Sequence, residues 1–259
     1  MALDLTRDAA TATLEQAAHV LYVAWQQPDR TITPVGRLTL GLDGTYEFRY
    51  LTRASEIMGR PFTSFPSFDT VYRSERLFPF FENRMVPTGR SDYPDWAVSV
   101  GLDADADPFE VLASSGGPRA TDTLELFRPP AVDRSLQRAS MRFLVRGVRH
   151  RGEKAQDAVD HLRPGDRLAV RPDRDNDVDP LALLVQPSTG VPVGWVPAYL
   201  CPVLHRLSAA NGGDFSSVVV TVRHVGDRKG PSHFRLLCDL EFPWPFEDDP
   251  FDTATFDCR

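Results

Sequence analysis

The apolar residues in the first half of the chain fall into short runs separated by polar turns, which is typical of an antiparallel sheet. Residues 20–26 are rich in strand-forming side chains. Residues 35–42 and 45–50 flank the dipeptide Asp43-Gly44, the strongest short signal for a β-hairpin. Aromatic and charged residues alternate within residues 45–50, so we expect one face of the hairpin to be buried. These runs predict a three-stranded antiparallel meander.

The chain after the hairpin is dense in phenylalanine but lacks a clean period between residues 61 and 81. This pattern predicts a coil that packs over a sheet. Asp107 precedes Pro108 at the start of an apolar stretch, which is the arrangement of an N-cap followed by a proline in the first helical turn. We expect helices at residues 77–86, 91–100 and 107–113, and a closing strand at residues 121–127.

In the second half, apolar strands alternate with loops of strong turn chemistry. Residues 162–165 (LRPG) predict a turn that leads into a strand at residues 167–171. Residues 171–179 (RPDRDNDVD) are too polar for a core, and their Asn and Asp side chains can bond nearby backbone amides and fix a structured loop. We then expect a returning strand at 190–196, a helix at 198–207 that begins at Pro197, and strands at 216–224 and 233–242.

The composition is that of a folded protein in a reducing compartment. A hydrophobic share of 42% and an aromatic share of 10% provide enough apolar surface for a core. The three cysteines (201, 238 and 258) contain no CxxC pair, so we expect no disulfide framework, no zinc site and a cytoplasmic location. Neither a signal peptide nor a membrane span is expected, because the N-terminus has no apolar run and no stretch reaches 18 consecutive apolar residues.

The net charge of −7 does not suggest a nucleic-acid binder, but the charges are unevenly distributed. Nine basic residues lie between residues 142 and 174, and seven acidic residues lie between residue 239 and the C-terminus. Local charge matters more to a phosphate than the total, because the Debye length is about 8 Å at physiological salt. Charge alone leaves two interpretations open: two solvated faces, or a phosphate-binding surface.

Candidate catalytic and metal-binding residues do not form recognisable constellations. The six histidines include no pair at i, i+4. The alternating acids of residues 173–179 lack the glycine and the closing glutamate of a calcium loop. Ser114 and Ser115 lack the G-x-S-x-G order of a nucleophile elbow, and Cys201 lies in an apolar helix, which favours a packing role. We therefore expect no metal, no cofactor and no enzymatic activity.

Four separated signatures in the second half resemble a HIRAN domain. They are Gly147-Val148-Arg149-His150, Leu162-x-x-Gly165-Asp166, Asn176-x-Val178-Asp179-Pro180-x-Ala182 and Val193-Gly194-Trp195-Val196-Pro197. HIRAN domains occur on helicase-like DNA-repair proteins and alone in many bacterial chains. The resemblance spans about residues 141–242. It implies a small β-barrel, related to the OB fold, that holds single-stranded DNA, in the best-known member by its 3′ end.

The resemblance also implies a set of nucleic-acid-binding residues. Arg149 and His150 occupy the positions of a basic residue and an aromatic residue that meet the nucleic acid, although Arg149 can also be read as an exposed arginine at a strand end. Asn176 and Asp179 fall on the family's Asn-Pro-Tyr-Asp loop, where the Asp can contact the terminal nucleotide. The stacking aromatic of that loop is replaced by Val178. Apart from the resemblance, two further candidates are Arg171 at the start of the loop and Trp195, which either offers a stacking face or belongs to the core.

The first part of the chain is similar to the N-terminal subdomain of HipA-type toxin kinases. The similarity lies in Val35-Gly36-Arg37-Leu38, in the hairpin end Phe48-x-Tyr50 and in Phe80-Phe81-x-Asn83-Arg84-Met85-x-Pro87. That subdomain is not the catalytic part of those kinases. No phosphate-binding glycine loop and no Asp-Phe-Gly motif is found in the sequence, so kinase chemistry is not expected.

Together these features predict an α+β, mostly β chain: an N-terminal antiparallel meander with short helices, then a small OB-like or SH3-like β-barrel with one helix. The tail is acidic and aromatic, and it is either disordered or folded back through Trp244, Phe246 and Phe251. The expected segments are a mobile lead-in (1–15), a HipA-N-like domain (16–128), a linker (129–140), the HIRAN barrel (141–242) and the tail (243–259).

The favoured function is a non-catalytic protein whose barrel binds single-stranded or frayed DNA, while its N-terminal domain engages a protein partner. The alternative is a protein–protein adaptor, or a regulatory subunit of a toxin–antitoxin or defence system, that has lost DNA binding. In a third variant, Asp248 and Asp249 of the tail cover the basic face and compete with phosphate for its arginines.

Overall fold

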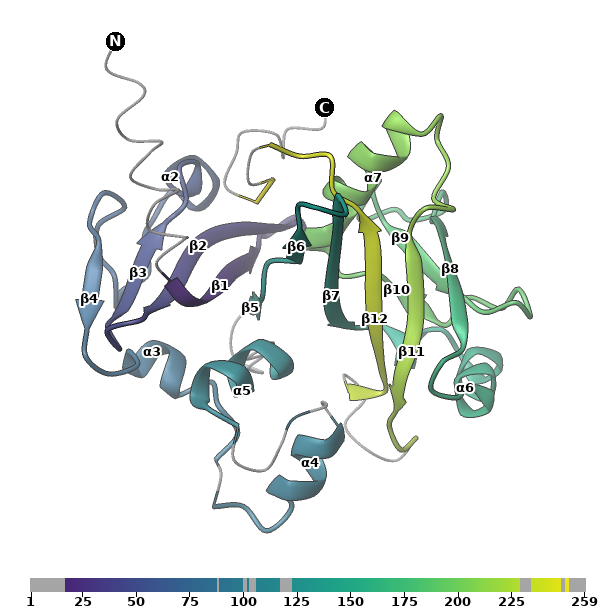
Figure 1. Cartoon of the computed structure of the whole chain (residues 1–259), viewed down its shortest axis with the longest axis horizontal. Coiled ribbons are helices and arrows are strands. Elements are labelled where there is room, and N and C mark those ends of the chain that lie inside the picture. Colours follow the sequence, from purple (N-terminus) through teal and green to yellow (C-terminus); the bar gives the residue numbers. More distant parts are fainter. Residues whose placement is uncertain are drawn as a thin grey trace. The chain divides into compact units, whose positions relative to one another are not determined.

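The computed structural model describes residues 17–87, 89–99, 102, 106–116, 123–228, 234–247 and 250–251. The predicted lead-in at residues 1–15 lies outside them. The chain divides into two compact units, each with its own sheet (Figure 1). Of the described residues, the first unit contains those up to Trp25, those from Pro34 to Met85 and those from Asp107 to Pro129. The second unit contains the other described residues. Within the described residues, no helix is both long enough and apolar enough to cross a membrane.

The sheet of the first unit has five strands in the order β4-β3-β2-β1-β5. The three strands of the predicted meander are neighbours in this sheet, and β2 pairs antiparallel with β3 from Gly36 opposite Tyr50 to Leu40 opposite Tyr46. The closing strand is confirmed in its described part, while β4 was not predicted. The strands are β1 (Ala17–Gln26), β2 (Ile32–Gly41), β3 (Tyr46–Tyr50), β4 (Tyr72–Ser74) and β5 (Leu124–Phe127).

An aromatic core covers this sheet, as the phenylalanine-rich segment predicted. The Phe48 ring is fully buried, and its centroid lies 4.1 Å from that of Phe65 and 5.6 Å from that of Phe81. The Tyr50 hydroxyl fixes the coil above the strand, because it donates to the Phe65 carbonyl at 2.9 Å and accepts from the Phe62 amide at 2.6 Å. Burial raises the pKa of Tyr50 to about 12, so the hydroxyl keeps its proton.

The predicted helix at residues 107–113 is confirmed with its cap. Asp107 accepts from the amides of Phe109 (2.7 Å) and Glu110 (3.1 Å), and the helix ends at Gly116, whose φ is +72°. The other two expected helices form but are shorter than predicted, and a further helix, α2, was not predicted. The helices are α2 (Ala54–Met58), α3 (Pro79–Glu82), α4 (Tyr93–Ser99) and α5 (Pro108–Ser115).

The sheet of the second unit has seven strands in the order β10-β9-β8-β11-β12-β7-β6. It curls until the chain just after β7 meets β10, where Arg146 and Trp195 exchange backbone hydrogen bonds of 2.8 and 2.9 Å. The predicted class, mostly β with a curled, barrel-like sheet, is confirmed. The strands are β6 (Ala131–Asp133), β7 (Arg138–Leu144), β8 (Arg167–Pro172), β9 (Leu183–Gln186), β10 (Gly194–Trp195), β11 (Val219–Val225) and β12 (Leu236–Pro243).

Two local predictions in this unit need correction. Residues 129–140, expected to be a linker, include β6 and the start of β7. The two strands form a hairpin, because Asp133 accepts from the amides of Ser135 (2.9 Å) and Leu136 (3.0 Å) and closes the turn. The strand expected at 190–196 is only the two residues of β10. The helix that follows Pro197 begins as a 3-10 turn, η2 (Ala198–Leu200), and continues as α7 (Cys201–Ala210).

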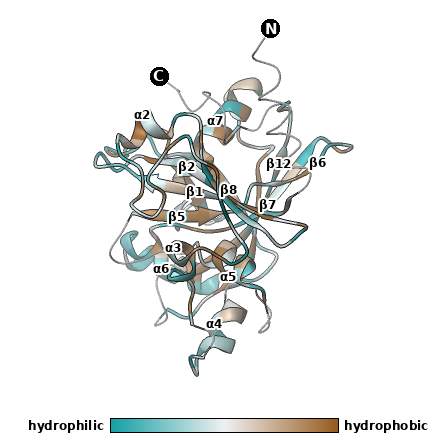
Figure 2. Cartoon of the chain, turned by 90° about the vertical axis from the view of Figure 1, so that its left-hand side faces the viewer, coloured by the Kyte–Doolittle hydropathy of each residue, from teal (hydrophilic) through white to brown (hydrophobic). Residues whose placement is uncertain are grey.

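A second helix of this unit, α6 (Glu153–His161), was not predicted because it is largely hydrophilic (Figure 2). It buries only Ala155 and Val159, which are four residues apart and therefore lie on one face. Its acidic side holds Arg228, whose guanidinium lies 2.8 Å from Asp157 and 3.0 Å from Asp160. Asp160 also pairs with the buried Arg235. Ionic contacts thus fix α6 against the chain that connects β11 and β12.

The described part of the C-terminal tail folds back, which was one of the two predicted alternatives. Phe246 and Phe251 are buried, and the guanidinium of Arg206 lies 4.6 Å from the centroid of the Phe246 ring. The Trp244 amide donates to the Gln137 carbonyl at 2.8 Å. Asp248 and Asp249, the acids of the competition hypothesis, lie outside the described residues.

The hydroxyl of Tyr50 provides a test of the first unit. We expect Tyr50→Phe to lower the free energy of unfolding by about 1–3 kcal/mol, because it leaves the Phe62 amide and the Phe65 carbonyl without their partner. Urea unfolding followed by circular dichroism measures this change. Tyr46→Phe is the matched control, since the Tyr46 hydroxyl has no hydrogen bond within the described residues; equal losses in the two variants would contradict the prediction.

Candidate nucleic-acid interface

Trp195 packs directly on the backbone of Gly147. Gly147 has a φ of +65°, and a Cβ placed on it would lie 2.6 Å from the Cε3 and Cζ3 atoms of Trp195. Only glycine combines this backbone conformation with so close an approach. Because Trp195 is half-buried, its position falls between the two predicted alternatives of a core residue and a stacking platform.

The indole nitrogen of Trp195 joins this contact to the polar loop that follows β8. Its Nε1 donates to Asp173 Oδ2 at 2.7 Å, and the Asn176 side-chain amide donates to the same oxygen at 3.2 Å. The Asp173 amide donates in turn to the Ala182 carbonyl at 2.8 Å, across the base of the loop. The carboxylate of Asp173 therefore connects strand β10 to the loop.

The loop between Asp173 and Leu181 is held by its own side chains, as its composition predicted. Asn176 Oδ1 accepts from the amides of Val178 (3.0 Å) and Asp179 (2.9 Å), and Asp179 Oδ1 accepts from the Leu181 amide (2.8 Å). Within the described residues, the second carboxylate oxygen of Asp179 has no hydrogen-bond partner, and 43% of the Val178 side chain is exposed. Asn176 shapes this loop, whereas Asp179 keeps an oxygen that can accept a bond from a ligand.

Arg149 and His150 lie on the short 3-10 turn η1 (Val148–His150), and both are exposed. Arg149 was expected at the end of a strand, but β7 ends at Leu144 and the left-handed conformation of Gly147 starts the turn. The Arg149 Nε donates to His150 Nε2 at 2.9 Å. Arg149 can therefore present its terminal nitrogens to a phosphate while its Nε is held.

Arg171 lies on the same face of the sheet as Trp195. Arg171 is paired with Leu184, which is paired in turn with Trp195, so the three residues form a row across β8, β9 and β10. Two strand spacings put the backbones of Arg171 and Trp195 about 10 Å apart. Arg171 is exposed, and its Nε donates to Gln186 Oε1 at 2.6 Å.

Some basic side chains of residues 142–174 pair with acids or lie below the surface, so fewer of them are available to a ligand. Arg142 lies 3.4 Å from Asp239, an acid of the C-terminal stretch, and Arg223 lies 3.5 Å from the same carboxylate. Arg146 is half-buried, and loss of solvent around its guanidinium lowers the pKa of that group. Cations that are not neutralised in this way remain on η1 and on β8, beside the row that contains Trp195.

The one cysteine near this interface among the described residues, Cys201, is not activated. Burial raises the pKa of the Cys201 thiol to about 12, and the nearby charge of Asp179 adds to the effect, so the thiol stays protonated. Within the described residues, no three His, Cys, Asp or Glu side chains gather where they could hold a metal ion. Asp173 and Asp179 of the loop accept the hydrogen bonds described above.

Hydrogen bonds join Trp195, Asn176 and Asp179 through Asp173 and the loop backbone, and Trp195 also contacts Gly147, where the turn with Arg149 and His150 begins. The structure adds two residues that the sequence analysis missed. Asp173 links the indole to the loop, and Arg151 places its guanidinium 4.8 Å from the centroid of the Trp195 ring. Both contacts join residues that are more than 20 positions apart, for which the sequence holds no local signal. A base can stack on Trp195 only where Arg151 leaves its ring uncovered.

Two solved structures resemble part of this chain. A crystal structure of a protein from Lactobacillus plantarum is 17% identical, with a TM-score of 0.31, over 40% of this chain and 95% of that chain. The crystal structure of the HIRAN domain of human HLTF is 20% identical, with a TM-score of 0.31, over 41% of this chain and 77% of that chain. No protein-family model and no curated protein matches the chain. The HIRAN and HipA resemblances therefore stay predictions from the sequence.

The contact between Gly147 and Trp195 can be tested with a matched pair of glycines. Gly147 and Gly165 both have positive φ, but a Cβ would have neighbours within 4 Å only at Gly147. We expect Gly165→Ala to cost about 1 kcal/mol from backbone strain alone, and Gly147→Ala to cost about 1–3 kcal/mol more from overpacking. Thermal unfolding compares the two variants, and equal shifts in Tm would contradict the close approach.

Proposed function

We propose that the second unit is a non-catalytic, HIRAN-type module that binds single-stranded DNA, and that the first unit engages a protein partner. The proposal rests on the four sequence signatures of residues 141–242. The structural observation that supports it most is the bonded unit around Trp195, since this residue packs on Gly147 at the start of the cationic turn and bonds Asp173 at the base of the polar loop. Three of the four signatures, those that contain Gly147, Asn176 and Trp195, thereby meet at one place.

Each residue has a distinct role in this proposal. Arg149 binds a backbone phosphate through its terminal nitrogens, and the exposed His150 ring offers a small stacking face. Asp179 accepts a hydrogen bond from a sugar hydroxyl with its second oxygen. Asn176 and Trp195 hold the loop and the turn in place and make their contribution by positioning.

Val178 makes this a weaker module than one with an aromatic residue at that position. A base stacked on an aromatic side chain contributes about 1–3 kcal/mol, and the exposed Val178 side chain has no ring to provide it. Affinity therefore depends mainly on phosphate contacts, and binding should weaken steeply as salt rises, because each neutralised phosphate releases counterions.

The adaptor alternative is favoured by a different observation, the apolar Val178 side chain at the exposed tip of the loop. An apolar tip suits a protein surface as well as a base. The two functions separate in one measurement, since an adaptor without DNA binding shows no affinity for oligonucleotides even at low salt.

The DNA-binding proposal predicts the behaviour of Arg149→Ala. We expect its affinity for single-stranded oligonucleotides to fall about tenfold or more, with a shallower salt dependence, because one charged contact to a phosphate is lost. Fluorescence anisotropy with single-stranded, duplex and 3′-blocked oligonucleotides measures this loss and reports on 3′-end capture. Arg134→Ala removes an exposed arginine from the β6–β7 turn and serves as the control. Equal affinities for the two variants would argue against Arg149 as a phosphate ligand.

The stacking argument predicts a gain of affinity in Val178→Tyr. An aromatic ring at this exposed position should strengthen single-strand binding about tenfold to a hundredfold, since it adds the missing base stacking. Val98→Tyr, at another exposed valine, is the matched control. If Val178→Tyr binds no better than wild type, the tip of the loop does not meet a base.

A further inference from the structure

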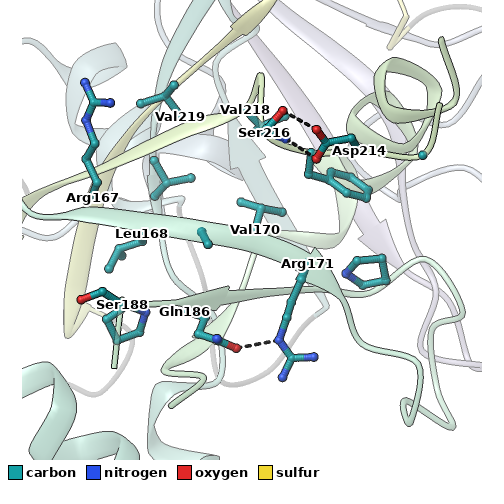
Figure 3. Close-up of a pocket in the computed structure, with 16 residues that line it drawn as sticks. Arg167, Leu168, Val170, Arg171, Gln186, Ser188, Asp214, Ser216, Val218 and Val219 are labelled. Carbon is teal, nitrogen blue, oxygen red and sulfur yellow. Dashed lines mark hydrogen bonds between the residues drawn. The ribbon is translucent and has the colours of Figure 1, made fainter. Parts of the chain in front are cut away.

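An open hollow lies beside β8 and extends to Pro172, which precedes the loop that contains Asp179. The strands β8 and β11 are paired only at Arg167 and Leu168, opposite Thr221 and Val220. A hollow of about 700 Å³ is lined by β8, by the end of β9 on one side of it and by residues between 213 and 220 on the other (Figure 3). This volume is within the range of about 300–1,000 Å³ that is typical of small-ligand sites.

The floor of the hollow is apolar, and part of its rim is cationic. Val170, Phe215 and Val218 are buried and line the floor. The rim on β8 carries Arg167 and Arg171, both exposed, which alternate with the buried Leu168 and Val170 along the strand and therefore share one face with Ala169. Within the described residues Arg167 has no hydrogen-bond or ion-pair partner, so its guanidinium can take a ligand oxygen.

The opposite rim carries a fixed carboxylate. Asp214 accepts from the Ser216 amide at 2.9 Å and from the Ser216 hydroxyl, and the hydrogen bond from that hydroxyl is the main reason that the pKa of Asp214 is lowered. In Figure 3 this pair lies on one side of β8, while Gln186, bonded to Arg171, lies on the other. A matching ligand has an anionic group for the arginines, a flat apolar body for the floor and an amino group for Asp214. A nucleotide whose base carries an amino group has all three.

The hollow is also placed to receive a strand from the interface described above. The row of Trp195, Leu184 and Arg171 crosses β10, β9 and β8 and ends at its rim. A single strand that follows this row crosses the sheet perpendicular to the β-strands, over about 10 Å from Trp195 to Arg171. A path of this kind is compatible with the 4–16 nucleotides, roughly, that one OB-type fold covers.

We propose that the hollow is a second nucleotide subsite, in which Arg167 and Arg171 bind backbone phosphates and one base enters between β8 and residues 213–218. The inference rests on the proposed function, because it extends the same single strand from the Asp179 loop across the sheet. It assigns Arg167, Asp214 and Phe215 to nucleic-acid binding, and it makes affinity depend on the length of the strand.

The test compares two oligonucleotides, dC3 and dC9, by fluorescence anisotropy at low and moderate salt. Cytidine is chosen because its base carries an amino group for Asp214. We expect wild type to bind dC9 at least tenfold more tightly than dC3. Arg167→Ala should weaken dC9 about threefold to tenfold, lower its salt slope by about 0.7 and leave dC3 unchanged. Arg134→Ala is again the control.

A second variant tests the hollow without removing a charge. Ala169 is exposed and lines the hollow, so Ala169→Phe fills it while both arginines remain. We expect the affinity of this variant for dC9 to fall toward that for dC3. The subsite is refuted if wild type binds dC3 but binds dC9 no more tightly. It is also refuted if Arg167→Ala and Ala169→Phe both bind dC9 as tightly as Arg134→Ala does. Either result leaves the proposed interface around Arg149 and Asp179 unaffected. If wild type binds neither oligonucleotide, the proposed function itself is refuted.

Discussion

The contact of Trp195 with Gly147 is the constraint on which the second unit depends. It lies where the curled sheet meets itself, since Trp195 also exchanges backbone hydrogen bonds with Arg146. The same side chain bonds Asp173, so one residue determines the meeting point of the sheet, the start of the cationic turn and the position of the polar loop. A Cβ at position 147 would force the indole away, and all three would shift together.

This arrangement divides the residues of the resemblance into two groups. Asn176 uses its side-chain oxygen for two backbone amides and its nitrogen for Asp173, so it builds the loop. Asp179 bonds the Leu181 amide with one oxygen only, and Arg149 keeps its terminal nitrogens. A sequence signature therefore contains both residues that shape an interface and residues that can touch a ligand. The two kinds are distinguished by whether their polar side-chain atoms already have a hydrogen-bond partner in the protein.

Local chemistry explains what could be predicted from the sequence. The Asp43-Gly44 hairpin, the Asp107 cap and the self-bonded loop after β8 depend on residues a few positions apart, and all three form as expected. The helix α6 could not be recognised in this way, because it buries only two side chains and its acids pair with Arg228, about 70 residues away. The hairpin β6–β7 was missed although its turn is local, closed by Asp133 with the amides of Ser135 and Leu136. As with α6, neither Asp173 nor Arg151 was predicted as a neighbour of Trp195: both contacts form only through tertiary structure.

The net charge of −7 is a poor guide to what this surface can bind, because the acids are not spread evenly over it. Asp239 faces Arg142 and Arg223 on neighbouring strands, and the acids of α6 surround Arg228, so these carboxylates are matched where they stand. Such exposed pairs add little stability, but they cancel charge locally. Arg149 and Arg167 have no acidic partner among the described residues. A phosphate within a Debye length of about 8 Å of either arginine interacts more strongly with it than with the net charge of the chain. The location of these two arginines, on η1 and on β8, is therefore a better guide to phosphate binding than the sign of the whole chain.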